Sequence, residues 1–186
     1  MQMNDSELLR EVSKGFERGR AGLALQAMAL ALVVPVAAAV VRFQGLTTVL
    51  LGLGVVSLVA VCVWRGQGLS TGALHGLKAG LVPLVFSLAA NAWGHVCIPG
   101  QGCSSLCVPA CVAGGVLAGL AIEWWARQSQ RPMVVRLSGA SVSLLTGALG
   151  CACVGSSGII GLVGGYVGAS LAGLTVRWVT RRTPAR

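Results

Sequence analysis

The cysteines carry most of the chemistry that this sequence could perform. Of the seven cysteines, all but Cys62 fall into two groups, one between residues 97 and 111 and one at residues 151–153. Thiolates bind soft metal ions, and pairs of thiols form structural disulfides or act as redox sensors. Cys62 stands apart, and we expect it to pack as a small apolar side chain. The candidate site residues are Cys97, Cys103, Cys107, Cys111, Cys151 and Cys153.

Three interpretations of these cysteines fit the sequence, and it does not choose among them. They could form structural disulfides in an oxidising compartment, with a connectivity that spacing alone does not reveal. They could bind a soft metal ion such as Zn, Cu or Cd, since Cys107 and Cys111 lie one helical turn apart and Cys151 lies close to Cys153. His95 could add a nitrogen ligand. They could also form a redox sensor, whereas a thioredoxin-like catalyst is disfavoured because the chain has no Cys-x-x-Cys motif.

The composition shows what kind of molecule must position these residues. Hydrophobic residues make up 55% of the 186-residue chain and charged residues only 10%, whereas soluble domains carry about 25% charged residues. The uncharged runs at residues 21–41 and 43–64 each match one membrane helix of roughly 20 residues. Those at residues 79–122 and 137–176 match two helices each and contain glycine-rich turns near their middle. The sequence therefore predicts an all-α polytopic membrane protein, with spans at approximately residues 21–41, 45–64, 73–94, 106–125, 135–153 and 157–177.

The basic residues predict the orientation of these six spans. The net charge is +9, and with six spans every Lys and Arg except Arg42 falls on one side of the membrane. The positive-inside rule makes that side cytoplasmic. We therefore expect a bacterial inner-membrane protein with a cytoplasmic segment at residues 1–20 and a basic cytoplasmic tail at residues 179–186. The net positive charge of the protein then reflects its orientation in the membrane, and we expect no direct binding of nucleic acid.

This orientation brings both cysteine groups to the outer face, from two separate helical hairpins. The weaker alternative for the first span is a signal peptide cleaved near residues 36–39. The segment before that span is long and mixed in charge, and the apolar run is long enough to span the membrane, so we favour an uncleaved helix.

Glycine spacing predicts close packing between the helices. Small residues four positions apart let helix backbones approach in lipid, where apolar burial no longer drives association. We expect these residues to pack the bundle rather than to form a specific dimer face. They are Gly72, Gly76 and Gly80 in the third span, and Gly161, Gly164, Gly165, Gly168, Ala169 and Gly173 in the last.

Ionisable residues are nearly absent from the middle of the expected spans. Four of the five acidic residues lie in the N-terminal segment, and the fifth, Glu123, lies at the cytoplasmic end of the fourth span. Ion-coupled transporters carry ionisable groups inside the membrane, and an aspartyl intramembrane protease needs two aspartates there. We therefore expect neither activity and no enzymatic function.

The N-terminal segment predicts a short amphipathic helix over residues 5–18. Ser6 is a suitable N-cap, and the acidic and basic residues of the segment balance. This helix could lie on the membrane or simply lead into the first span. A helix held on anionic lipid would be enriched in Lys and Arg, so docking in a groove on a partner protein is the other alternative. The apolar stripe that would bind the partner consists of Leu8, Leu9, Val12 and Phe16.

In this layout the chain resembles the six-helix membrane anti-sigma factors of bacteria, the negative regulators of the sigma F type. The resemblance lies in the short cytoplasmic segment at residues 5–18, the six spans and the outer cysteines, with Cys97 or Cys103 matching one position and Cys151 or Cys153 the other. It implies that the protein holds a sigma factor at the inner membrane and responds to heavy-metal stress through these cysteines. The chain differs from that pattern in having six outer cysteines instead of a pair.

The prediction is therefore a regulatory membrane protein that lies in the lipid bilayer and binds a cytoplasmic sigma factor. A signal would act through the outer cysteines by shifting the bundle between two states. The alternatives are a small soft-metal transporter or channel and a membrane thiol redox protein.

Overall fold

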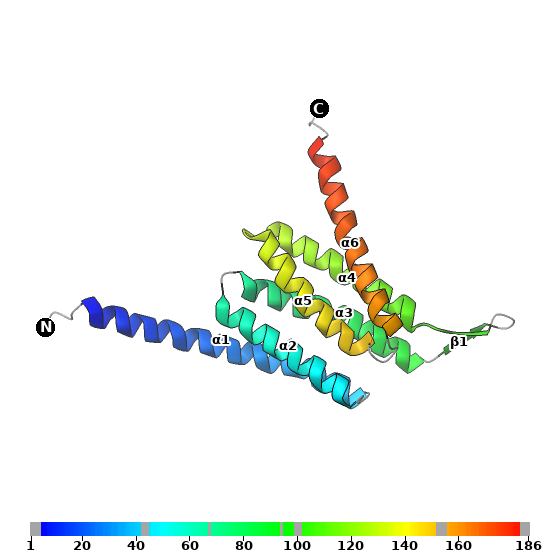
Figure 1. Cartoon of the computed structure of the whole chain (residues 1–186), viewed down its shortest axis with the longest axis horizontal. Helices are drawn as coiled ribbons and strands as arrows, with labels where there is room; N and C mark the ends of the chain where they lie inside the picture. Colours follow the sequence, from blue (N-terminus) through cyan, green and yellow to red (C-terminus); the bar gives the residue numbers. More distant parts are fainter. Residues whose placement is uncertain are drawn as a thin grey trace.

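The computed structural model describes residues 5–41, 45–66, 68–93, 95–98, 102–151 and 156–182. Among these residues, six helices are long and apolar enough to cross a membrane, the number of helices that the sequence predicted (Figure 1). Large apolar side chains on the bundle surface, including Leu25, Val40 and Ile160, are exposed, as in a membrane protein. The elements are α1 (Asp5–Val41), α2 (Leu46–Arg65), α3 (Leu69–Trp93), β1 (His95–Ile98), β2 (Gly102–Ser105), α4 (Cys107–Gln128), α5 (Pro132–Cys151) and α6 (Ser156–Arg182).

The N-terminal segment leads directly into the first span, one of the alternatives left open by the sequence. The chain forms one continuous helix, α1, from Asp5 to Val41, without the boundary expected after residue 18. Residues 18–21 contain neither a proline nor a polar capping residue that would end a helix, and a single glycine costs only about 1 kcal/mol. The N-terminal part of α1 therefore extends beyond the other helices as a continuation of the first span (Figure 1).

The other helices run beyond the uncharged segments from which the spans were predicted. Helix α4 continues to Gln128 and α6 to Arg182, because backbone hydrogen bonding does not stop where charged side chains reach the interface. Between α2 and α3 the chain reverses at Gly66 and Gly68, whose φ angles of 62° and 89° suit glycine.

The fold is all-helical in its long elements, as predicted; the short β-hairpin between α3 and α4 was not predicted. We expected only a turn at residues 97–105. Strands β1 and β2 pair antiparallel, with His95 opposite Ser105 and Cys97 opposite Cys103. The hairpin projects from the end of the bundle in Figure 1.

The glycines of α3 let it pack directly on α5, as predicted. A Cβ atom built on Gly76 would lie 2.5 Å from the carbonyl oxygen of Gly139. One built on Gly80 would lie 2.6 Å from the Cβ of Thr146. The backbones are thus as close as glycine allows, and α5 lies at the centre of the bundle, with α3, α2 and α4 against it.

The glycines of α6 divide into two faces, only one of which packs the bundle. A Cβ on Gly165 would meet the backbone of Val112 and Val116 of α4, and a Cβ on Gly173 would meet the side chain of Glu123. Gly164 and Gly168 have no atom near their Cβ positions within 4 Å. The prediction of bundle packing is therefore wrong for this pair, because the helix turns it away from α4.

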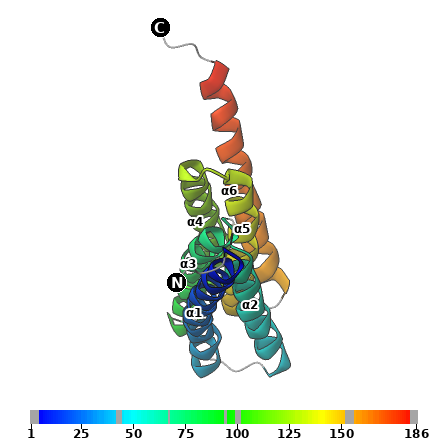
Figure 2. The same ribbon diagram turned by 90° about the vertical axis from the view of Figure 1, so that its left-hand side faces the viewer.

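The helices form an open arrangement in which α1 and α6 lie at opposite margins. Helix α1 packs chiefly on α2, and α6 chiefly on α4. Figure 2 shows the C-terminal part of α6 extending past the remaining helices. The bundle thus has an interior formed by α3, α4 and α5, to which α6 is attached through α4 and α1 through α2.

The close approach of α3 and α5 predicts a steric asymmetry between two alanine substitutions. Gly76→Ala should destabilise the protein by about 1–3 kcal/mol, because the added methyl group collides with the α5 backbone. The matched control Gly164→Ala should cost no stability and should add up to about 1 kcal/mol, because its Cβ enters open space and alanine is the better helix former. The midpoint of thermal unfolding in detergent measures both. Equal midpoints for the two variants would contradict the packing described for α3 and α5.

Candidate functional site

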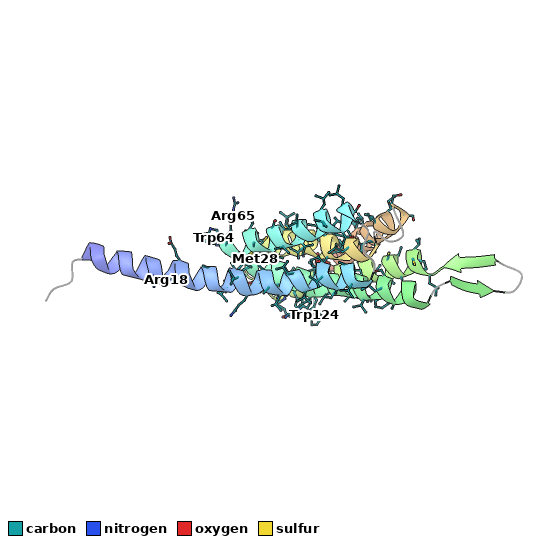
Figure 3. The ribbon with its side chains drawn as sticks, turned by 90° about the horizontal axis from the view of Figure 1, so that it is seen from below. Arg18, Met28, Trp64, Arg65 and Trp124 are labelled. Atoms are coloured by element: carbon teal, nitrogen blue, oxygen red, sulfur yellow. The ribbon has the colours of Figure 1, made fainter. Side chains whose placement is uncertain are left out.

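The two ends of the bundle differ in chemistry. We call the end that carries the β-hairpin and Cys151 the hairpin end, and the end that carries the α2–α3 and α4–α5 turns the turn end. In Figure 3 the labelled Arg18, Trp64 and Arg65 lie toward the turn end, away from the hairpin. The cysteine site predicted from sequence falls at the hairpin end.

Two of the six predicted cysteines come together inside the bundle. Cys111 lies one turn into α4, and Cys151 is the last residue of α5. Both side chains are fully buried, and they pack in the same small cluster. Leu162 of α6 completes this small cluster. The arrangement joins three helices around a pair of thiols that are not linked as a disulfide.

The remaining candidate cysteines are placed differently. Cys107 is the first residue of α4, half-buried. Cys97 and Cys103 face each other in the strand register, and their side chains lie outside the described part of the structure. Cys153 falls among residues 152–155, which are also outside it. Cys62 is buried at the α1–α2 side of the bundle in the largest apolar cluster, away from the thiol pair.

A cage of three or more ligands is not found among the described residues. No group of three His, Cys, Asp or Glu side chains that could hold a metal ion occurs within the residues searched. Cys111 and Cys151 supply two sulfur atoms, a donor set that suits soft ions. The same pair could instead lose two electrons and two protons to form a disulfide. Both reactions would replace the packing contact of two thiols with a stronger link between α4 and α5.

The predicted partner-binding residues lie on the N-terminal part of α1. Leu8, Leu9, Val12 and Phe16 fall within its helical range, and their side chains lie outside the described part of the structure. The helical backbone preserves the spacing of three and four residues that places them on one face.

A buried ion pair at the turn end was missed by the sequence reasoning. The Nη2 of Arg136 donates a hydrogen bond to Oε2 of Glu123 at 2.9 Å, and its Nε lies 2.8 Å from Oε1. Glu123 is on α4 and Arg136 on α5, and their side chains are 7% and 19% exposed. The contact therefore joins the same two helices that the thiol pair joins at the opposite end.

The short α4–α5 turn explains why these two charges meet. The backbone N–H of Arg131 donates to the hydroxyl of Ser129, and Pro132 begins α5, a position that suits proline. Glu123 and Arg136 lie at nearly equal distances along the chain from this turn. This equal spacing on either side of the turn could have predicted the ion pair, because two antiparallel helices bring such positions to the same level along their axes.

Aromatic contacts accompany the ion pair. The ring of His75 on α3 stacks on Trp125 of α4, with centroids 4.6 Å apart and planes 15° apart. Tyr166 of α6 is buried and packs in one cluster with Ala79 of α3 and Ile122 of α4. Polar and aromatic side chains thus connect α3, α4, α5 and α6 near the turn end, where sequence reasoning predicted no site.

Comparison of the chain with protein-family models, curated proteins and solved structures finds no match.

The ion pair predicts a large cost when only one partner is removed. Glu123→Leu should destabilise the protein by about 3 kcal/mol, because Arg136 is left charged and unpaired. The double variant Glu123→Leu/Arg136→Met should recover most of that loss, since apolar residues often replace a buried pair without cost. Thermal unfolding in detergent measures both, with Arg131→Gln in the exposed turn as the control. A single variant as stable as the control would contradict a stabilising pair.

Proposed function

We propose that this protein is a non-enzymatic regulatory protein of the bacterial inner membrane that holds a sigma factor at the cytoplasmic face. The observation that carries the sensing part of the proposal is the buried contact between Cys111 and Cys151. A thiol-reactive metal ion or oxidant would act on this pair, changing the packing of α4 against α5. The resemblance to membrane anti-sigma factors supports the choice of partner.

The distribution of charge supports an orientation with both termini in the cytoplasm. Arg65, Arg127 and Arg131 lie at the turn end, and α1 enters the bundle from that side with Arg18 (Figure 3). Basic residues concentrate on the cytoplasmic side of membrane proteins. The hairpin end would then face the periplasm, where thiols meet external metals and oxidants.

The continuity of α1 supports the output part of the proposal. A change at Cys151 moves α5, which packs against α2, and α2 packs against α1. Because α1 has no break between the bundle and Asp5, a displacement of its membrane part would be transmitted to the stripe at Leu8, Leu9, Val12 and Phe16. For the signal to release the partner, it is enough that two states of the bundle bind the partner with different affinities.

The thiol pair also suits soft-metal transport, which makes transport the second candidate. A carrier would need to pass the ion from Cys111 and Cys151 to a second group of ligands nearer the turn end. Cys62 lies in a separate apolar cluster with residues of α1, α2 and α3, so the two sulfur sites are not in contact. Uptake of Cu or Cd into proteoliposomes distinguishes transport from regulation.

The regulatory proposal predicts a retained cytoplasmic partner. A sigma factor should co-purify with the detergent-extracted full chain, and replacing Leu9 and Val12 with aspartate should abolish its retention, because charged groups would enter the apolar interface. The matched control is replacement of Arg10 and Lys14 on the polar face with glutamine. Retention unaffected by the aspartate variant, or no sigma factor bound to the wild-type chain, would overturn the proposal.

The sensing step predicts a specific requirement for the buried pair. Exposure to Cd²⁺ or a thiol oxidant should release the partner from the wild-type protein but not from Cys111→Ser or Cys151→Ser. Cys62→Ser should respond as the wild type does, because Cys62 belongs to another cluster. Release measured by pull-down before and after exposure gives the comparison. A full response from both serine variants would show that the signal acts elsewhere.

A further inference from the structure

The β-hairpin brings two cysteines into direct opposition. Strands β1 and β2 are four residues each, and their antiparallel register pairs Cys97 with Cys103. Residues directly opposite in an antiparallel pair have Cα atoms about 4.5 or 5.5 Å apart. Disulfides join Cα atoms about 4.4–6.8 Å apart. The backbone register is therefore compatible with a bridge between these two cysteines in either type of pair.

We propose that Cys97 and Cys103 form a disulfide that closes the hairpin. The register selects this pairing from the many that six outer cysteines allow. Cys111 and Cys151 are already in contact with each other inside the bundle, so neither is the natural partner of a strand residue. The hairpin bridge and the buried thiol pair are then two separate sets of sulfur atoms.

The position of the hairpin explains what the bridge contributes. A two-stranded hairpin alone is marginally stable in water, and this one projects beyond the helices (Figure 1). Residues 95–105 connect α3 to α4, so a closed hairpin limits how far the two helix ends can separate. A permanent bridge there would keep the adjoining ends of α3 and α4 close together while the Cys111–Cys151 pair is oxidised or binds a metal ion.

The oxidation is balanced by a disulfide donor. Each thiol loses its proton, the two sulfur atoms bond, and the two electrons reduce the disulfide of a thiol–disulfide exchange protein or of glutathione to two thiols. In cells this requires the oxidising compartment, so formation of the bridge in vivo rests on the proposed periplasmic position of the hairpin end. The pairing itself does not depend on orientation.

Differential alkylation of the purified full chain tests the pairing. The protein is oxidised by molecular oxygen with copper–phenanthroline as catalyst, which leaves no mixed disulfide on a lone thiol. Its remaining thiols are blocked with iodoacetamide, and the disulfides are then reduced and labelled with N-ethylmaleimide. Peptic peptides analysed by tandem mass spectrometry should carry the second label at Cys97 and Cys103. In Cys97→Ser, Cys103 should change to the first label, while the control Cys62→Ser should keep the wild-type pattern. First labels at both positions in the wild type would overturn the proposal, as would a second label retained by Cys103 in Cys97→Ser.

The same labelling in intact cells tests the hairpin disulfide separately from the proposed regulatory function. A bridge in both the purified protein and cells supports the pairing and the periplasmic position of the hairpin. A bridge in the purified protein but free thiols in cells supports the pairing and overturns the proposed orientation. A bridge that forms while Cys111→Ser still responds fully to Cd²⁺ supports the hairpin disulfide and overturns the sensing role of the buried pair.

Discussion

The bundle depends on the close approach of α3 and α5. In lipid the apolar surface of a helix gains little by leaving its surroundings, so helices associate through tight van der Waals packing. Gly76 and Gly139 bring the two backbones together with no side chain between them. Pro83 of α3 is accommodated in the same way, since a Cβ on Gly114 or Gly147 would lie 2.6 Å or 2.9 Å from its atoms. This contact sets the position of α5, and α2 and α4 pack around it.

Helices α4 and α5 are joined near their two ends by contacts of different kinds. At the turn end the Glu123–Arg136 ion pair includes a charge-assisted hydrogen bond from Nη2 to Oε2, a strong form of hydrogen bonding. At the hairpin end the Cys111–Cys151 contact is the packing of two buried thiols, which are weak hydrogen-bonding groups. The weaker contact is also the one that a metal ion or oxidant can change chemically. A reaction there would alter one end of the helix pair while the other stays held.

The features predictable from sequence were those set by local composition. Charge gaps predicted six helices because charged side chains are expensive inside a membrane, and the glycine stripe of α3 packs as expected. The thiol contact was not predictable, because it depends on how α4 and α5 are rotated about their axes. Cys107 lies on the same helix as Cys111 but outside the contact with Cys151. The pairing of Cys97 with Cys103 became visible only with the register of the two strands. The Glu123–Arg136 pair was within reach of sequence reasoning, since both charges lie at similar distances from one turn.

The continuous α1 helix changes how a signal would cross this molecule. A separate N-terminal helix on a flexible joint could bind a partner without sensing the bundle. An unbroken helix has no such freedom: its polar end must tilt or rotate with its membrane part. Helix α1 packs chiefly on α2, and Gly52 of α2 receives Pro35 of α1, since a Cβ there would lie 2.7 Å from the proline Cβ. The α1–α2 contact is therefore the step through which any rearrangement of the central helices would have to act on the N-terminal stripe.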